Sequence, residues 1–551
     1  MPRPAAPSLL LLLTGFVAAA CLYMFFLEPW GHDTWYHLQR LLDVEHQVGR
    51  GQFRMHFAEN AAQGKGLPVW IYYSQWVYLP AMLLTSLGVS PLISLKLVYC
   101  AFLVVCCVGC YRLFRLDTDD HAAAFGTLLF MTSNYVLGEV FQRSAYAEFL
   151  SVALLPLLLV ALHRTVLHGD RSSGMTVVLL ASLMILFHPL SFMNAGCAVV
   201  AYAAYTAIGA RIPYRQLLRL VPLFSLALGL TAFYWLPAVI ETRYVMGGEG
   251  VPTPLRDTFL TARRYLNFSS VTNLGFVLTV LAPVVGCCLL LRRHRTDPPT
   301  RRSWPLVAGI IIYVFLTLRL SEPLYTHLPF LAANLWVWRV LYPLTLLVAI
   351  FVTTNLRALP PQLRSNRALG GLAGLAVLQA IVFTLWNSAE ELSVRRLETG
   401  EIEQTVAVES QLTGGFGIDE YLPQPGMLPS VGDKCPSVRS VLAAGPYEMS
   451  FTITPDDADA CIHVPRYWNT RYAAWIDGEA VPVYADTAGE IVIAPHGRTG
   501  VLTLRYTRPA YVTFSVFLSG AAALLLLIGV ARRSTARYQA TPNKGDSEER
   551  V

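Results

Sequence analysis

Charged residues are scarce in this sequence, and their scarcity excludes an ordinary water-soluble fold. Asp, Glu, Lys and Arg together make up 14% of the 551 residues, whereas hydrophobic residues make up 54%. A soluble globular domain carries roughly a quarter of its residues as charged side chains. Apolar stretches of about 20 residues, each long enough to cross a bilayer, recur from the N-terminus to near residue 531. The composition therefore predicts a polytopic membrane protein.

The common nucleotide-binding signatures are also missing. The sequence contains neither a GxxxxGKS/T phosphate loop nor a Rossmann-type glycine cluster after a strand. This disfavours nucleotide-driven transport and a nucleotide-sugar donor bound to a soluble domain. The net charge of +6 comes from short basic clusters between apolar runs, so no nucleic acid is expected as a partner. The histidines of the first polar loop follow no spacing typical of zinc ligands.

Apolar length and basic linkers together predict the topology. We expect about twelve membrane helices, near residues 8–28, 92–114, 121–138, 148–166, 174–190, 192–209, 216–238, 270–291, 304–319, 340–356, 368–386 and 511–531. The Arg-rich linkers between them then all fall on the side of the N-terminus, which the positive-inside rule makes cytoplasmic. We therefore expect a multi-pass protein of the plasma (inner) membrane, with both the N-terminus and the C-terminus in the cytoplasm.

The opposite side receives the longer polar loops, beginning with the first outer loop, 29–91. Within this loop the segment 69–88 is apolar but rich in Trp and Tyr. Counting it as a membrane span would move the next basic linker to the outer side. We therefore expect it to form a helix lying along the membrane interface, where aromatic rings are favourable.

The polar block 387–510 differs in character from the membrane domain, 1–386. Segments with β-branched residues, such as YEMSFTITP and EIVIAP, alternate with turn residues and predict strands. We expect an extracytoplasmic β-sandwich here, followed by the last membrane helix, 511–531, and a disordered cytoplasmic tail, 532–551. Both Cys435 and Cys461 lie in this block, so they are a candidate disulfide if the block lies outside the cytoplasm.

Several stretches, taken in order, resemble a known family. They are GHDTWYHLQRL, GLPVWIYYS, RSAYAEFLSVALLPLLL, FHPLSF, FYWLPAVIETRYV and HLPFLAANLWVWRVLYPL. Their order and membrane side resemble those of the YfhO-like and 6-pyruvoyl-tetrahydropterin synthase related membrane proteins, which belong with the GT-C class of glycosyltransferases. The stretch from Tyr467 to Pro509 also resembles the β-domain that closes many YfhO-like chains. The resemblance implies a mainly helical, GT-C-like fold and transfer of a sugar from a polyprenyl-phosphate carrier on the extracytoplasmic face.

The resemblance also implies an acidic residue in the first outer loop, and in this sequence that position is Asp33. Glycosyl transfer needs a carboxylate that relieves the acceptor hydroxyl of its proton, so Asp33 is the expected catalytic base, with His32 and His37 in the substrate site. The alternative is a helix N-cap, for which Asp is favoured. Many GT-C enzymes carry two adjacent acids here, whereas this chain has His-Asp. The cofactor is therefore unknown, with a divalent metal ion as the candidate.

The second outer loop, 138–147, supplies further acids and a cation. A lipid phosphate leaving group needs fixed positive charge, which the fork of an arginine provides best. We expect Arg143 to bind substrate, and Glu148 and Glu139 to be further catalytic acids. The alternative is a structural ion pair between Arg143 and Glu148 at the entry of a helix.

Five other residues on the outer side are candidates for substrate binding. They are Arg339, Arg263, Arg264, His188 and Glu241. Each also has a simpler interpretation, such as snorkelling to the headgroups for an arginine or hydrogen-bonded packing for a histidine.

Three functions remain open from the sequence. The favoured one is an integral-membrane glycosyltransferase, with a polyprenyl-phosphate-linked sugar as donor, a glycan, lipid or protein as acceptor, and membrane lipids around it. The second is a transporter or flippase of lipid-linked saccharides. Transporters usually show internal repeats and polar residues at the midplane, and neither is evident here. The third is a non-catalytic scaffold for envelope polymer synthesis.

Overall fold

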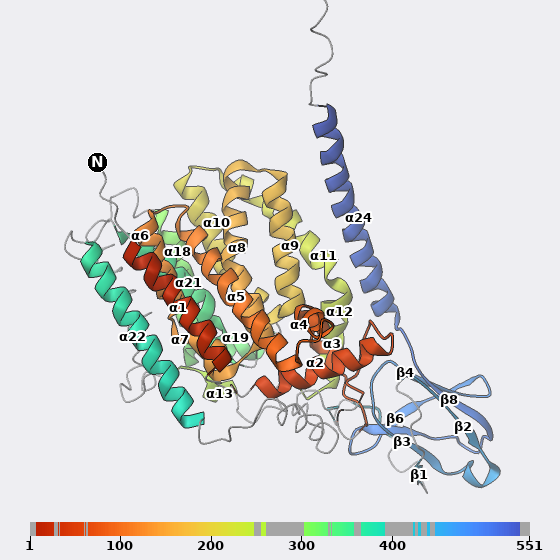
Figure 1. Cartoon of the computed structure of the whole chain (residues 1–551). Helices are drawn as coiled ribbons and strands as arrows, with labels where there is room; N and C mark the ends of the chain where they lie inside the picture. Colours follow the sequence, from red (N-terminus) through yellow and green to blue (C-terminus); the bar gives the residue numbers. More distant parts are fainter. Residues whose placement is uncertain are drawn as a thin grey trace, which may run out of the picture.

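The computed structural model consists of a helical body and a small β-domain, which is joined to one end of a long helix (Figure 1). It describes residues 7–26, 31, 33–59, 61, 64–246, 255–260, 302–328, 331, 333–334, 336–356, 365–391, 423–424, 428–430, 438–440 and 447–539. The fold class predicted from the sequence, a mainly helical membrane protein with a β-domain near the C-terminus, is confirmed.

The helical body is built from apolar helices whose bounds follow the hydrophobic runs of the sequence. They are α1 (Pro7–Phe26), α5 (Pro91–Phe114), α6 (Asp120–Met131), α8 (Tyr146–His168), α9 (Arg171–Phe187), α10 (Pro189–Gly209), α11 (Leu220–Leu230), α12 (Ala232–Glu241), α18 (Trp304–Thr317), α21 (Leu341–Thr354), α22 (Asn366–Glu391) and α24 (Ala510–Gln539). Among the described residues, six helices are long and apolar enough to cross a membrane, or up to eight if each of two bent pairs is one span. The predicted span 270–291 lies outside the described residues.

Two predicted spans are bent rather than straight. The predicted span 216–238 becomes α11 and α12, and the two halves of this pair meet at 75°. The predicted span 304–319 becomes α18, followed at 86° by a pair of short helices, Arg319–Ser321 and Glu322–His327. Helix α24 also continues to Gln539, so the tail predicted as disordered from 532 begins helical. Its ARRSTAR segment is rich in Ala and Arg, which are good helix formers.

Helix α8 forms the centre of the helical body. Its 18-residue apolar core is 83% buried, and it packs against α5, α9 and α10. A helix that is hydrophobic on every side is stable only when other helices surround it. The N-terminal end of α8 is therefore fixed by packing, which matters because the candidate site lies there.

The first outer loop packs on the helical body as a set of short helices. Helix α2 (Thr34–Gly49) lies across one end of the bundle (Figure 1) and buries Leu38, Leu41 and Val44 along one face. The predicted interfacial helix 69–88 is wrong as a single element. It is divided into α3 (Val69–Tyr72), the 3-10 helix η1 (Gln75–Tyr78) and α4 (Leu79–Thr85), because Tyr73 and Ser74 adopt extended conformations.

Part of this segment is core rather than membrane interface. Tyr78 is fully buried, while Leu83 and Leu87 of the α4 region are exposed at 63% and 80%. The aromatic residues of η1 therefore serve packing, and the apolar surface is restricted to α4 and the residues after it.

In the residues that the structure describes, the β-domain is a sandwich of two four-stranded sheets, as predicted. The strands are β1 (Val438–Ser440), β2 (Glu448–Ile453), β3 (Cys461–Tyr467), β4 (Tyr472–Ile476), β5 (Glu479–Val481), β6 (Val483–Ala485), β7 (Glu490–Ile493) and β8 (Gly500–Tyr506). One sheet has the order β1-β3-β7-β6 and the other β2-β8-β4-β5. Alternating buried residues of both sheets share one hydrophobic core. Cys461 is disulfide-bonded, and Cys435, its predicted partner, lies outside the described residues.

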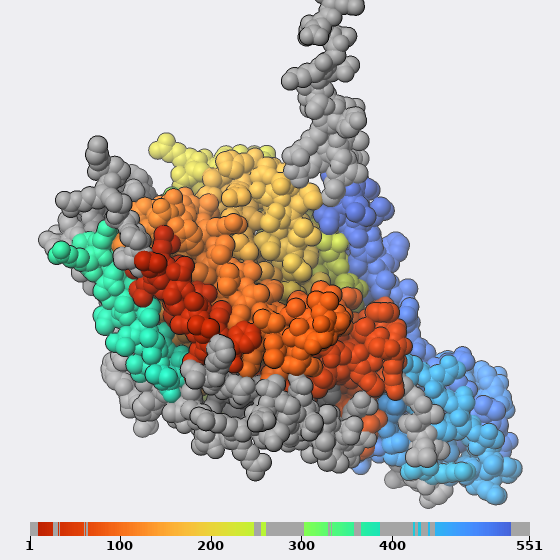
Figure 2. All heavy atoms as spheres, viewed as in Figure 1, coloured from red at the N-terminus to blue at the C-terminus, as the bar shows by residue number. Residues whose placement is uncertain are grey.

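The first outer loop and the β-domain form a continuous contact. Phe57 of the loop is buried inside the hydrophobic core of the β-domain, and Lys65 forms an ion pair with Glu490 at 2.5 Å. Figure 2 shows the orange-red atoms of the first loop directly beside the blue β-domain. The β-domain is therefore fixed on the loop that also carries Asp33.

Candidate functional site

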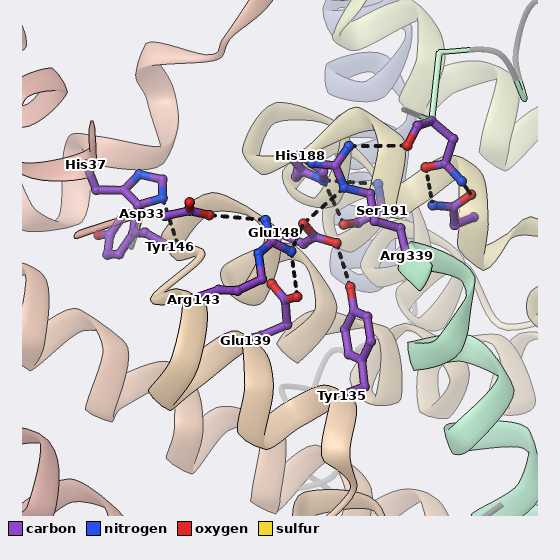
Figure 3. A network of polar contacts seen from close by, with 12 residues as sticks. Asp33, His37, Tyr135, Glu139, Arg143, Tyr146, Glu148, His188, Ser191 and Arg339 are labelled. Atoms are coloured by element: carbon purple, nitrogen blue, oxygen red, sulfur yellow. Dashed lines mark hydrogen bonds and ion pairs between the residues drawn. The ribbon is translucent and has the colours of Figure 1, made fainter. Parts of the chain in front are cut away.

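Five charged side chains from separate parts of the chain meet at one end of the helical body. Arg143 is at the centre of this cluster (Figure 3). Its guanidinium contacts Asp33 at 3.1 Å, Glu139 at 2.7 Å and Glu148 at 3.3 Å. Arg339 completes the cluster by contacting Glu148 at 3.3 Å. We call these five residues the charged cluster.

The local backbone brings Glu139 and Arg143 onto one face. After the short helix α7 (Asn134–Leu137), the chain forms a π-helical segment, η2 (Gly138–Arg143). Such wide turns are rare and are found frequently at functional sites. Ser144 then adopts a left-handed conformation, with φ of 55°, which reverses the chain into α8 and places Glu148 on the other side of Arg143.

The first and second outer loops are joined through their backbones. The N–H of Asp33 donates to the carbonyl of Arg143 at 2.9 Å, and the N–H of Gly31 donates to the Ser144 hydroxyl at 3.1 Å. A Cβ at position 31 would overlap the backbone of Arg143 and Ser144. Only glycine fits this close approach, which sets the position of Asp33.

Glu148 is held by three donors and is the most restrained acid of the cluster. One of its oxygens accepts a hydrogen bond from the Tyr135 hydroxyl at 2.5 Å. The other accepts from both Arg143 and Arg339 at 3.3 Å. Its side chain is only 4% exposed. Glu148 therefore aligns the two guanidinium groups rather than offering a free carboxylate.

Glu139 is equally buried but only half satisfied. One oxygen accepts from Arg143, while within the described residues the other has no hydrogen-bond partner. Burial, together with the nearby charges of Glu148 and Asp33, raises the pKa of Glu139 to about 8 despite the attraction of Arg143. Three carboxylates share two guanidinium groups, so a proton on Glu139 balances the charge of the cluster.

Asp33 is the accessible acid of the three. Its side chain is 24% exposed, compared with 4% for Glu139 and for Glu148. It occupies the N-cap position of α2, but its carboxylate makes no capping hydrogen bond. Its carboxylate points to Arg143 instead, so the N-cap alternative does not explain it. A partly exposed carboxylate beside a fixed cation can accept a proton from an incoming hydroxyl.

His37 supports the cluster from behind and is not free to bind a ligand. Its Nε2 accepts a hydrogen bond from the backbone N–H of Tyr146, the first residue of α8, at 3.0 Å. Its Nδ1 therefore carries the proton and donates to the Tyr78 hydroxyl at 2.8 Å. Burial and the charge of Arg40 hold the pKa of His37 well below its usual value. The neutral ring joins α2 to α8, so the geometry does not support the predicted substrate contact.

Arg339 reaches the cluster from the segment before α21. Its backbone belongs to the 3-10 helix η8 (Val337–Val340), and one of its terminal nitrogens donates to the Asn334 carbonyl at 3.4 Å. The side-chain amides of Asn334 and Asn194 of α10 bond reciprocally at 3.0 and 3.1 Å. Arg339 is therefore held in place rather than extended toward the headgroups.

His188 lies at the junction of α9 and α10, close to Arg339 (Figure 3). Its Nδ1 accepts from the hydroxyl and the backbone N–H of Ser191, at 2.8 and 3.2 Å. The proton is therefore on Nε2, which has no hydrogen-bond partner in the described part of the chain. A neutral N–H donor of this kind can bond a phosphate or sugar oxygen.

The other predicted site residues are not in the charged cluster. Glu241, at the end of α12, is ion-paired with Arg471 of the β-domain, so its geometry does not support a shared site with Asp33. His32, Arg263 and Arg264 lie outside the described residues.

Three residues that the sequence does not single out also order the site. In the sequence, the only signal that places Tyr135 near the site is its position one helical turn before Glu139. Asn194 and Asn334 are single polar residues within apolar stretches, and such residues tend to find hydrogen-bond partners inside a membrane domain. Neither signal specifies the partner.

The part of the chain that the structure describes contains no group of three or more His, Cys, Asp or Glu side chains arranged to hold a metal ion. Each acid of the charged cluster is instead in contact with a guanidinium group. A divalent ion stays a prediction that the geometry does not support.

A model of a membrane-protein family matches more than half of the chain. The sequence model described as "6-pyruvoyl-tetrahydropterin synthase related domain; membrane protein" matches residues 71–391. This range contains four members of the charged cluster and His188. No curated protein matches the chain.

Several solved membrane-protein structures match the chain at low sequence identity. Arabinofuranosyltransferase AftD from Mycobacteria is 18% identical, with a TM-score of 0.46 over 73% of this chain and 29% of its own. ArnT from Cupriavidus metallidurans, solved bound to undecaprenyl phosphate, is 12% identical, with a TM-score of 0.41 over 89% of this chain and 98% of its own. Oligosaccharyltransferase AglB from Archaeoglobus fulgidus is 11% identical, with a TM-score of 0.37 over 74% and 55%. The chain thus spans under a third of the length of AftD.

Proposed function

The chain belongs to the 6-pyruvoyl-tetrahydropterin synthase related family of membrane proteins, and we propose that it is a glycosyltransferase using a sugar carried on a polyprenyl phosphate. The observation that carries the proposal is the accessible carboxylate of Asp33, held 3.1 Å from Arg143 at an end of the helical body. Glycosyl transfer from a lipid phosphate needs a base and fixed cations at one membrane face. The charged cluster supplies both.

In the proposed reaction, Asp33 accepts the proton of the acceptor hydroxyl. The hydroxyl oxygen forms a bond to the anomeric carbon of the sugar, and the bond from that carbon to the phosphate oxygen breaks. The electron pair of the broken bond stays on the departing polyprenyl phosphate. Arg339 then neutralises part of the phosphate charge, and both Arg339 and His188 donate hydrogen bonds to the phosphate oxygens, since both retain unused donors. Preorganised donors of this type stabilise developing charge without reorganising during the reaction.

The buried acids position these groups. Glu148 orients Arg143 and Arg339 together, so the spacing of the two cations is fixed before a donor arrives. Protonated Glu139 adds no negative charge that would repel the phosphate. The acceptor, a glycan, lipid or protein, reaches Asp33 from the side of the first outer loop, where the β-domain is docked. On the predicted topology this side is extracytoplasmic.

The test compares Asp33→Asn with a matched control, Asp459→Asn, in the full-length chain reconstituted in lipid. Asp459 is exposed on the β-domain, so its replacement changes the same functional group away from the cluster. Each protein receives labelled polyprenyl-phosphate sugars and an envelope glycan and lipid extract as acceptors. We expect Asp33→Asn to lose at least a hundredfold in transfer, which is within the typical contribution of a general base. Equal transfer by Asp33→Asn and the control would overturn the assignment of the base.

A further inference from the structure

A second concentration of arginines lies where the β-domain joins α24. Arg471, the residue just before β4, donates to one carboxylate oxygen of Glu241 from Nε at 2.8 Å and from Nη2 at 2.5 Å. Tyr511, near the start of α24, donates to the same oxygen at 3.0 Å. The side chains of Arg471 and Glu241 are 3% and 0% exposed. The charge of Glu241 is therefore committed to Arg471.

The first outer loop supplies the next contact. A terminal nitrogen of Arg471 lies 3.1 Å from Nδ1 of His56, which accepts the hydrogen bond. Burial, together with the charges of Arg471, Arg54 and Arg508, lowers the pKa of His56 to about 3. His56 is therefore neutral and adds no charge of its own.

Two more arginines flank these contacts along the chain. Arg54 precedes His56 by two residues, and Arg508 follows Thr507. The backbone N–H and hydroxyl of Thr507 both donate to the carbonyl of Arg471, at 2.7 and 2.8 Å. We call Arg54, Arg471 and Arg508 the arginine cluster.

The charge of this arginine cluster is not balanced. Within the described residues Arg54 and Arg508 form no ion pair, and Arg471 uses Glu241. Burial and the repulsion of Arg508 and Arg471 lower the pKa of Arg54, in keeping with like charges held together. Like charges at short range destabilise a fold, so a cluster of this kind is stabilised by an anion.

The position of the arginine cluster indicates where that anion comes from. Helix α24 begins at Ala510, two residues after Arg508. An 18-residue window within its apolar part, Ala510–Gly529, has a mean hydropathy of 2.2, and only 17% of this window is buried inside the protein. The start of such a helix lies at the level of lipid headgroups. Phe53, next to Arg54, is 68% exposed. An exposed aromatic ring beside a cation is typical of a loop that touches the membrane surface.

We infer that the arginine cluster binds the phosphate of an anionic phospholipid headgroup beside the start of α24. The guanidinium forks of Arg54 and Arg508 supply paired donors for phosphate oxygens. Anionic lipid is favoured over zwitterionic lipid because two positive charges remain uncompensated in its absence. The bound lipid would hold the β-domain and the first outer loop at a fixed height on the membrane.

This site is distinct from the charged cluster. Asp33 precedes the first residue of α2, whereas Arg54 follows its last residue. A helix of 16 residues is about 24 Å long at 1.5 Å per residue. Lipid binding and glycosyl transfer are therefore separable by mutation.

The experiment titrates the purified full-length chain in detergent with short-chain phosphatidylglycerol, phosphatidylcholine or inorganic phosphate, and follows the rise in Tm. The test variant is Arg54→Gln/Arg508→Gln. The control is Arg498→Gln, which changes an exposed arginine in a turn of the β-domain. We expect the double variant to bind phosphatidylglycerol about thirtyfold more weakly than wild type. This corresponds to about 1 kcal/mol for each of two basic residues at a lipid surface.

A second signature distinguishes lost binding from lost folding. Without lipid, the double variant is expected to be at least as stable as wild type, because the replaced charges repel each other and Arg471. Unchanged affinity of the double variant for phosphatidylglycerol would overturn the proposal. Inorganic phosphate or phosphatidylcholine acting at the same concentration as phosphatidylglycerol would overturn the assignment to an anionic lipid.

Discussion

Replacing Arg143 with methionine removes the cation that contacts Asp33, Glu139 and Glu148 at the same time. Glu148 keeps Arg339 and the Tyr135 hydroxyl as partners, whereas Glu139 loses its contact at 2.7 Å. Breaking a buried ion pair by removing one partner costs about 3–5 kcal/mol. Because Glu139 can take up a proton, we expect a loss near the lower end, about 3 kcal/mol in the free energy of unfolding.

The double variant isolates the contribution of Glu139 to this loss. If unpaired Glu139 causes much of the loss, Arg143→Met/Glu139→Gln is expected to recover about 1 kcal/mol or more relative to Arg143→Met. Interaction energies of about 0.5–3 kcal/mol are usual for residues in one ion-pair network. The measurement is reversible unfolding of the full-length chain in mixed micelles at a pH above the pKa of Glu139, about 8, where its carboxylate is ionised in the wild type.

The matched control is Arg319→Met, which removes an exposed arginine paired with Glu322. An exposed pair contributes at most about 1 kcal/mol, so this variant is expected to behave like wild type. Equal losses for Arg143→Met and Arg319→Met would refute the claim that the charged cluster is a buried network. Additive losses in the double variant would refute the coupling of Glu139 to Arg143.

Three further predictions address the same region. Gly31→Ala is expected to lower transfer by about a hundredfold, since a misplacement of about 1 Å has that effect, whereas Gly49→Ala, with open space around its Cα, is expected to leave transfer unchanged. Tyr135→Phe removes a donor to a buried carboxylate, and thermal unfolding is expected to show a loss of about 2 kcal/mol. The pKa of Glu139 is raised to about 8 in the folded state. Between the ordinary pKa of a glutamate and pH 8, the folded state therefore binds more protons than the unfolded state. Wild-type stability is therefore expected to fall as pH rises through this window, by up to about 1.4 kcal/mol per pH unit. Glu139→Gln is expected to remove this part of the decline. Identical pH profiles for the wild type and the variant would contradict the assignment of the raised pKa to Glu139.

The membrane helices were predictable because apolar length is a local property of the chain. The predicted span 92–114 corresponds to α5, Pro91–Phe114, and the predicted span 192–209 ends with α10. The bends were not predictable from hydropathy, since both α11 and α12 are apolar. The interfacial segment 69–88 was mispredicted because composition does not show where an extended residue interrupts a helix.

The charged cluster was predictable only in part. Arg143 and Glu148 are five residues apart, so their contact could be anticipated from the sequence. The contact between Asp33 and Arg143 spans 110 positions and depends on the backbone pairing of Gly31 with the second loop. Glu241 was misplaced because the sequence shows the end of a helix on the predicted outer side but not its partner, Arg471, 230 positions later. The predicted topology and substrate stay predictions.

The release of free polyprenyl phosphate is the measurement that tests the proposed function most directly. Proteoliposomes containing the wild-type chain would receive a polyprenyl-phosphate sugar labelled in both its lipid and its sugar, together with the acceptor extract. We predict that one polyprenyl phosphate is released for each sugar that becomes attached to acceptor. Movement of the intact donor between leaflets, without release of polyprenyl phosphate, would contradict a glycosyltransferase and indicate a transporter.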